Sequence, residues 1–235
     1  IGPALKSTAT IMFCHSFALR FGLIEPPAGV DVALVAPKGP GAALRAEYEA
    51  GRGLAALVAG SSEPALQTAL SYASALGCAR TMIMETTFAE ECETDLFGEQ
   101  AVLCGGVPAL SKMGFDTLVD AGYQPEVAYF ETVHEVKLIV DLIYSRGIAG
   151  MRQAISDTAE WGGYVAGDRL VTAQTRQAMN ELLERIKDGA FAKEWIREHA
   201  GGRRRMTAYR SDEASLPVES AGEFVRRGVL RCGES

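Results

Sequence analysis

The sequence lacks the features of a membrane protein or a nucleic-acid-binding protein. No apolar run reaches the roughly 18–20 residues that a membrane helix needs, and we find no signal-peptide pattern. Lys and Arg number 23 against 30 Asp and Glu, and the formal net charge of -7 argues against general nucleic-acid binding. The one basic run, at 203–205, favours a solvated tail segment over a phosphate-binding role. We therefore expect neither a membrane nor a nucleic-acid partner.

Cysteine is scarce, and its spacing excludes a disulfide framework or a zinc motif. The five cysteines are odd in number, scattered, and form no C-x-x-C pair. They are Cys14, Cys78, Cys92, Cys104 and Cys232. Reduced thiols in a cytoplasmic protein are the simplest interpretation.

The start of the chain also lacks two expected features. It begins with Ile1 rather than Met, and no Gly-x-Gly turn precedes a helix before Val32. A dinucleotide-binding fold carries such a turn where it holds the pyrophosphate. We interpret the sequence as truncated at its N-terminus, with a naturally shortened protein as the alternative. The apolar strands around 32–36 and 54–59 would then be left partly uncovered.

Strand and helix patterns alternate over residues 1–88. This alternation predicts an α/β portion, the C-terminal part of a Rossmann-like doubly wound sheet, and the run at 32–36 suits a buried parallel strand. Pro64 is placed to open a helix that ends at Gly77. The expected strands and helices are, in chain order, 32–36, 43–50, 54–59, 65–76 and 81–84.

The strand signal then disappears, and residues 89–235 are predicted to form an all-α domain. A hydrophobic content of 48% is ample for the cores of two packed domains. Residues from 201 onward are polar, and we expect them to wrap over the surface. The expected helices are 93–103, 107–121, 126–144, 151–160 and 172–199, the last one broken near Gly189.

Two carboxylate pairs with helical spacing are the most informative feature. Asp95 and Glu99 are four residues apart, as are Glu131 and Glu135. Residues i and i+4 share one helix face, where two carboxylates repel unless a cation lies between them. The pairs therefore indicate an oxygen-rich site for a hard divalent ion, with magnesium as the first candidate. A solvated helix face, or acids that stabilise a helix N-terminus, is the competing interpretation.

Neighbouring residues leave the second pair available to a metal. Lys137 is the one base in this predicted helix, and its acidic neighbour at helical spacing is Asp141, so we expect these two to pair. His134 is interpreted as a packed residue rather than a ligand.

The order of these motifs resembles ketol-acid reductoisomerase, an enzyme family of branched-chain amino-acid synthesis, in its short form. The stretch at 94–106 carries most of the resemblance, and Ser-Asp-Thr-Ala-Glu at 156–160 adds independent weight. The matching segments are 35–41, 85–88, 93–106, 121–123, 128–131, 134–144 and 156–160. The resemblance implies a knotted helical domain after the α/β portion.

The resemblance also implies residue roles. Two Mg²⁺ ions would be held by Asp95, Glu99, Glu131 and Glu135, with the last two, like the substrate-binding Ser156, supplied by a partner subunit. His15 and Lys38 would have active-site roles, and His15 and Pro40 would contact the cofactor. Glu135 or a water on the metal would relay a proton. One departure is Ser16 and Ala18, where the family has Gly and Asn after the histidine.

The function implied is conversion of a 2-hydroxy-3-keto acid such as 2-acetolactate into a 2,3-dihydroxy acid, by alkyl migration and then reduction by NADPH. A homodimer or higher homo-oligomer would share the active sites. A helical metal-binding and dimerisation module without reductase activity is one alternative. Another is a different hydroxyacid dehydrogenase, which the double carboxylate pair disfavours.

Overall fold

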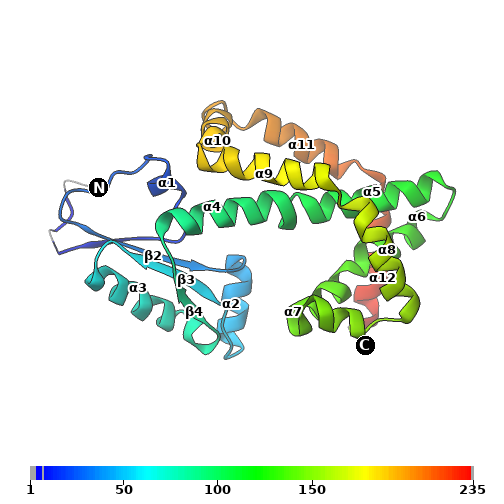
Figure 1. The fold of residues 1–235 in the computed structure, drawn as a ribbon, viewed down its shortest axis with the longest axis horizontal. Helices are drawn as coiled ribbons and strands as arrows, with labels where there is room; N and C mark the ends of the chain where they lie inside the picture. The colour runs from blue at the N-terminus through cyan, green and yellow to red at the C-terminus, as the bar shows by residue number, and fades with distance from the viewer. Residues whose placement is uncertain (1–3, 7, 234–235) are drawn as a thin grey trace. The chain divides into compact units, whose positions relative to one another are not determined.

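The computed structural model describes residues 4–6 and 8–233 (Figure 1). The chain divides into two compact units, residues 1–97 and 98–235, and each is described by itself. The division falls within helix α4 (Phe88–Gly98), whereas the sequence places the domain boundary at 88/89.

The first unit is built on a four-stranded mixed sheet. Its strands lie in the order β1 (Thr10–Phe13), β2 (Asp31–Pro37), β3 (Ala56–Gly60) and β4 (Ile83–Glu85). The outer pairs are parallel, and the central pair β2/β3 is antiparallel. The α/β portion is confirmed, but the interpretation of 32–36 as a parallel strand holds only for its pairing with β1. An apolar run reports burial on both faces and carries no information on strand direction.

Both faces of strand β2 are buried. Ala33 and Val35 pack on one face, and Leu34 and Ala36 on the other, as the alternation of a strand requires. Helix α3 (Glu63–Ala75) covers the first face, and Phe88 packs on the second. The expectation of partly uncovered strands is wrong for 32–36, where every residue is at most 7% exposed. In the segment 54–59, Leu54, Ala55 and Leu57 are partly exposed, as expected.

Helix α3 begins and ends as its sequence predicts. Ser62 caps its first turn by accepting a hydrogen bond from the N–H of Ala65, and Pro64 lies in that turn. Gly77 follows the helix with a φ of 87°, a conformation that favours glycine. The first unit also contains α1 (Phe17–Arg20), α2 (Gly41–Glu49) and a 3₁₀ turn (Cys78–Arg80).

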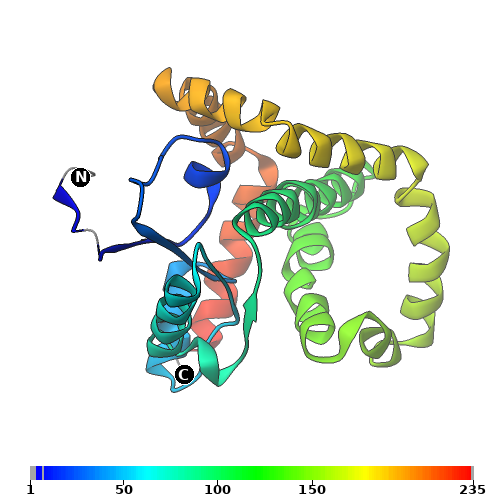
Figure 2. The ribbon, with the colours of Figure 1, turned by 60° about the vertical axis from the view of Figure 1, so that its left-hand side comes forward.

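The second unit is all-helical. Figure 2 shows the chain turning from α7 through α8 to α9. Gly189, with a φ of 77°, separates α9 from α10, so the predicted break is confirmed. The helices are α5 (Gly106–Asp120), α6 (Pro125–Tyr129), α7 (Val136–Gln153), α8 (Asp157–Leu170), α9 (Ala173–Lys187), α10 (Ala190–Ala200), α11 (Arg204–Ala214) and α12 (Pro217–Gly233).

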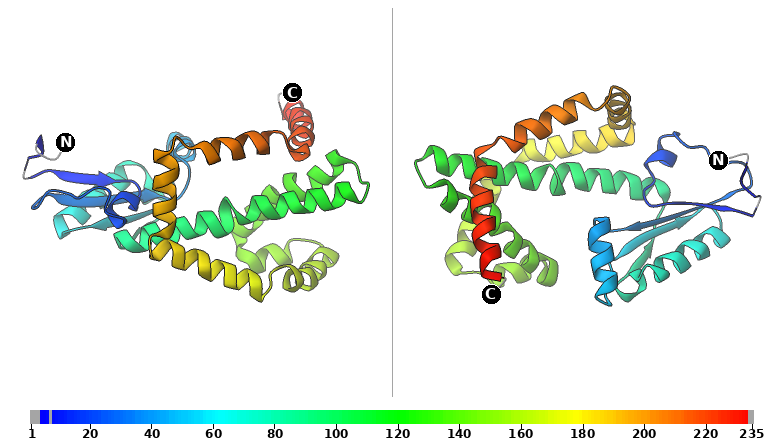
Figure 3. Two further views of the ribbon diagram at one scale, coloured as in Figure 1. Left: turned by 90° about the horizontal axis from the view of Figure 1, so that it is seen from above. Right: turned by 180° about the vertical axis from the view of Figure 1, so that it is seen from behind.

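The C-terminal helix belongs to the core of this unit. Ala221 and Val225 of α12 are buried with Phe115, Ala128 and Tyr129 of α5 and α6, and Figure 3 shows α12 (red) running beside the green helices. Although α11 has no buried residue, the expectation that residues from 201 onward wrap over the surface is therefore wrong for those of α12. Their apolar residues are few, but helical spacing gathers them on one face.

Two π-helical turns interrupt the helices of this unit. One covers Glu99–Leu103, and the other covers Phe130–His134 between α6 and α7. The single long helix predicted over 126–144 is therefore wrong at its centre. A π turn is rare and has no propensity signal, so the apolar pattern alone indicates an unbroken helix.

None of the described helices is long and apolar enough to cross a membrane.

Candidate active site

The first unit gathers His15, Lys38, Glu91 and Asp95 at one edge of its sheet. His15 follows the end of β1, and Lys38 follows the end of β2. Because these two strands are parallel, their carboxyl ends lie at the same edge. Open α/β sheets bind their ligands in the crevice outside such ends. Helix α4 brings Glu91 and Asp95 to the same place.

The buried carboxylate of Glu91 is the centre of this cluster. Its side chain is 1% exposed. Oε2 accepts hydrogen bonds from the hydroxyl of Ser16 at 2.8 Å and from its backbone N–H at 3.0 Å. Oε1 lies 3.2 Å from Nδ1 of His15 and 3.3 Å from Nζ of Lys38. Because a carboxylate can only accept, Nδ1 of His15 carries the proton.

These contacts keep Glu91 ionised. Burial alone would raise the pKa of its carboxyl, but the hydrogen bonds from His15 and from Ser16 outweigh burial and lower the pKa to about 2. Negative charge is therefore fixed at this edge of the sheet down to strongly acidic pH.

Asp95 adds a second carboxylate to the cluster. Nζ of Lys38 lies 2.9 Å from its Oδ1, and Nδ1 of His15 lies 3.7 Å from its Oδ2. One ligand atom each from His15, Glu91 and Asp95 lie within 4.8 Å of one another. The two carboxylates supply oxygen atoms of the kind that a hard divalent ion prefers, and the ion pair of Lys38 with Asp95 shows that a cation fits against Asp95.

The other predicted metal ligands lie in the helical unit. Glu99 is the first residue of one π turn, Glu131 lies in the other, and Glu135 follows it. All three are exposed. Within the described part of the chain, the one group of three potential ligands with clustered atoms is His15, Glu91 and Asp95.

The predicted pair of Lys137 and Asp141 is confirmed, at 2.5 Å. His134 makes an edge contact with the ring of Phe130. Ser156 is exposed and caps α8 by accepting a hydrogen bond from the N–H of Ala159, and Pro40 immediately precedes α2. Substrate and cofactor contacts at Ser156 and Pro40 stay predictions.

Glu91 and Ser16 were not singled out from the sequence. A signal for Glu91 was present, because it lies one helical turn before Asp95. It was missed because the helix was predicted to begin at Glu93, whereas α4 begins at Phe88. Thr87 starts the helix by accepting a hydrogen bond from the N–H of Glu90, and Thr-x-x-Glu is a readable start pattern. Ser16 gave no signal beyond its difference from the family.

The π turns change the geometry of the carboxylate pairs. The N–H of Cys104 donates to the carbonyl of Glu99 at 2.8 Å, and the N–H of Glu135 donates to that of Phe130 at 3.1 Å. Both bonds span five residues rather than four. Residues four apart are therefore not stacked across such a turn as they are in an α-helix, which corrects the one-face argument for Glu131 and Glu135.

Two consecutive glycines permit the first π turn. A Cβ on Gly105 would lie 2.0 Å from the carbonyl oxygen of Gln100, and one on Gly106 would lie 2.4 Å from that of Ala101. Both oxygens belong to the backbone, so they cannot swing aside as a flexible side chain can. Glycine is needed here for close approach of the backbone, since neither residue has a positive φ.

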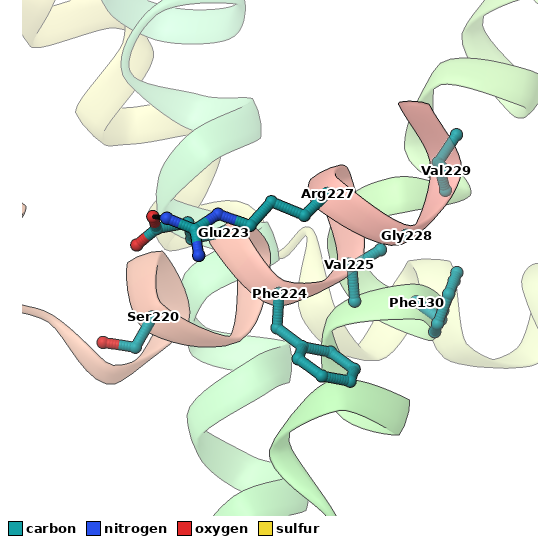
Figure 4. A pocket seen from close by; sticks show the side chains of 8 residues that line it. All are labelled: Phe130, Ser220, Glu223, Phe224, Val225, Arg227, Gly228 and Val229. Carbon is teal, nitrogen blue, oxygen red and sulfur yellow. Dashed lines mark hydrogen bonds and ion pairs between the residues drawn. The ribbon is translucent and has the colours of Figure 1, made fainter. Parts of the chain in front are cut away.

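A large cleft of the helical unit is lined by none of the four residues of the cluster. It has a volume of about 770 Å³ and lies between α12 and Phe130 (Figure 4). Its two charged residues, Glu223 and Arg227, pair with each other. The lining is otherwise largely apolar, so the cleft offers little to orient a small polar substrate.

Comparisons with known proteins agree over both units. A family model described as "Acetohydroxy acid isomeroreductase, NADPH-binding domain" matches residues 1–82, and "Ketol-acid reductoisomerase, C-terminal domain" matches residues 88–229. The structure of an NADH-preferring ketol-acid reductoisomerase from an uncultured archean is similar, with a TM-score of 0.93 and 43% identity. That match covers 97% of this chain and 70% of the other.

More distant structures share the fold alone. A putative oxidoreductase from Jannaschia sp. CCS1 matches with a TM-score of 0.52 and 14% identity, covering 79% of this chain and 69% of the other. A semialdehyde dehydrogenase NAD-binding protein from Cupriavidus necator gives the same TM-score and identity, covering 76% and 68%.

The role of Gly105 can be tested by stability. Gly105→Ala should lower the free energy of unfolding by about 1–3 kcal/mol, because the added methyl group meets a backbone carbonyl. Gly98→Ala is the matched control, since a Cβ there has no atom within 4 Å and φ is -58°. It should raise stability by about 0.5–1 kcal/mol. Urea denaturation followed by circular dichroism measures both, and similar effects at the two glycines would contradict the account.

The state of Glu91 predicts an acid dependence of stability. Its pKa is about 2 in the folded chain against 4.5 as a free group, so its stabilising contribution is complete above pH 4.5 and is lost as the pH falls towards 2. Glu91→Gln should remove this part of the pH dependence, measured as the denaturation midpoint between pH 6 and 2. Glu85→Gln, on exposed Glu85 of β4, controls for the loss of one charge. Parallel curves for wild type and Glu91→Gln would refute the assignment.

Proposed function

Because the chain belongs to the ketol-acid reductoisomerase family, we propose that His15, Lys38, Glu91 and Asp95 form part of its active site. The protein is a ketol-acid reductoisomerase of branched-chain amino-acid biosynthesis, with a nucleotide-binding first domain. The observation that carries the proposal is the buried Glu91 at the carboxyl ends of β1 and β2, held by groups from three other positions. Strongly perturbed carboxylates in such a crevice are candidates for function.

The non-enzymatic alternative is set aside. A helical metal-binding module would need only the second unit, whereas the NADPH-binding-domain model matches residues 1–82 of the first. The match of 43% identity to a ketol-acid reductoisomerase structure also argues against a different hydroxyacid dehydrogenase.

For the metal, we propose that Asp95 and Glu99 hold magnesium, together with Glu131 and Glu135 of the partner subunit. The carboxylate oxygens are the ligands that this ion prefers, and the pairing of Lys38 with Asp95 supports a cation at that position. Bound magnesium supplies Lewis-acid polarisation of the hydroxyl and ketone oxygens of the substrate.

The substrate we propose is a 2-hydroxy-2-alkyl-3-keto acid such as 2-acetolactate. Its alkyl group moves from C2 to the ketone carbon, the C2 hydroxyl loses its proton, and the former ketone oxygen gains one. Hydride and a second proton then reduce the new C2 ketone to give a 2,3-dihydroxy acid. Lys38, which pairs with Glu91 and Asp95, offers N–H protons to the substrate. Glu135 is the proposed proton relay. Ser156 of the partner subunit is the proposed substrate contact.

The hydride comes from a nicotinamide dinucleotide. We place its contacts at His15 and at Pro40, which immediately precedes α2. The matched family model is described as NADPH-binding, and the similar structure is of an NADH-preferring enzyme. NADPH is our proposal, and both nucleotides belong in the assay.

We propose a homodimer or higher homo-oligomer with shared sites. Large apolar side chains stand exposed on α7 and α8, where Tyr144 is 87% exposed, Ile148 66% and Trp161 71%. Surfaces of this kind mark contacts with another protein, and a second copy of this chain is the partner that the shared-site proposal requires.

A cytoplasmic location is proposed on the free thiols of Cys14, Cys78, Cys92 and Cys104.

The metal assignment predicts the effect of Asp95→Asn. The substitution keeps size and removes charge, so turnover by the full-length enzyme should fall by on the order of 100-fold while the fold survives. Asp116→Asn is the matched control, because it breaks an ion pair with Lys112 on the helical unit and should leave turnover unchanged. Steady-state kinetics over a range of Mg²⁺ concentrations checks both. Near-normal turnover of Asp95→Asn with unaltered Mg²⁺ dependence would show that Asp95 is not a magnesium ligand.

Shared sites predict complementation between two inactive subunits. Co-expressed Asp95→Asn and Glu131→Gln full-length chains should recover about a quarter of wild-type activity, because half of randomly formed dimers are mixed and each mixed dimer has one intact site of two. Each variant expressed alone is the control. If light scattering shows dimers but the mixture stays inactive, the sites lie within single subunits.

A further inference from the structure

Ser16 and Glu91 are the two buried polar residues among those that the structure describes. Ser16 is 0% exposed and Glu91 is 1% exposed. A buried polar group is costly unless it is hydrogen-bonded, and these two satisfy each other. Ser16 donates twice to the same oxygen of Glu91, from its hydroxyl at 2.8 Å and its N–H at 3.0 Å.

The two oxygens of Glu91 share His15 but otherwise have different partners. Oε2 accepts both hydrogen bonds from Ser16 and lies 3.3 Å from Nδ1 of His15, while Oε1 lies 3.2 Å from the same Nδ1 and 3.3 Å from Nζ of Lys38. A carboxylate fixed at one oxygen cannot rotate freely about its terminal torsion, which is otherwise broad. Its second oxygen then stays at the point where the imidazole and the ammonium meet.

We propose that Ser16 is a positioning residue: its hydroxyl fixes the plane of the Glu91 carboxylate, and Glu91 in turn holds His15 and Lys38 in the arrangement that the reaction needs. This rests on the proposed function, in which the cluster is part of the active site. Ser16 immediately follows His15, so its backbone N–H and hydroxyl anchor the loop and the carboxylate together. The hydroxyl adds a second donor to Oε2, so it restricts the orientation of the carboxylate more than the backbone N–H does by itself.

Ser61, another serine of this unit whose hydroxyl makes a hydrogen bond, gives a comparison. The hydroxyl oxygen of Ser61 accepts a hydrogen bond from the N–H of Val32 at 2.9 Å and so also joins two distant segments. It has no contact with the cluster. Loss of its hydroxyl should therefore weaken the fold without altering the active site.

The test compares full-length enzymes carrying Ser16→Ala, Ser16→Cys, Ser61→Ala and Glu91→Gln. Ser16→Ala should lower kcat about tenfold, the loss expected for a hydrogen bond to a charged group, with KM for 2-acetolactate changed less than twofold. Ser16→Cys keeps the size and a weaker donor, so its kcat should be intermediate. Ser61→Ala should shift the denaturation midpoint and leave kcat unchanged.

Three outcomes would overturn the proposal, and they are distinguishable. Normal kcat in Ser16→Ala with an impaired Glu91→Gln would reject Ser16 and leave the active-site assignment standing. An equal loss of kcat in Ser61→Ala would show that both serines act through general stability. Normal kcat in Glu91→Gln would reject the active-site assignment itself, and the proposal with it. If Ser16→Ala does not fold, the kcat of Ser16→Cys decides, and a value equal to wild type overturns the proposal.

Discussion

The buried carboxylate of Glu91 is the constraint on which the candidate site depends. A charge removed from water must be compensated, and here the compensation comes from Ser16, His15 and Lys38. These groups follow β1 and β2, while Glu91 itself is carried by α4. The hydrogen bonds and the ion pair to this one carboxylate therefore join the ends of two strands to the helix that also carries Asp95. Packing of the sheet fixes the strand ends, and the charge fixes the helix against them.

The elements that sequence predicted well are those with local signals. Ser62, Pro64 and Gly77 define α3 because capping, fixed φ and positive φ each act within one or two residues. Gly189 separates α9 from α10 for the same reason. The antiparallel pairing of β2 with β3 was missed because strand direction depends on non-local packing, which an apolar run does not encode.

In the candidate site too, residues with a local sequence signal were predicted and the others were not. His15, Lys38 and Asp95 were singled out through their motifs, and the structure brings them together. Glu91 was missed because a helix start was placed five residues late, so a carboxylate one turn before Asp95 was left outside it. The π turns were missed because they need backbone contacts such as those of Gly105 and Gly106, whose glycines also suit an ordinary turn. The position at which helix α4 was predicted to begin thus determined that Asp95 was identified and Glu91 was not.

The central proposal is that Asp95, in the cluster organised by Glu91, is one of the residues that hold the catalytic cation. Anomalous diffraction from crystals of the full-length enzyme grown with Mn²⁺ in place of Mg²⁺ tests it most directly. The account predicts an anomalous peak at coordination distance, about 2.0–2.2 Å, from the Asp95 carboxylate, with Lys38 displaced from the ion pair seen here. A peak elsewhere, with Lys38 still paired to Asp95, would contradict it.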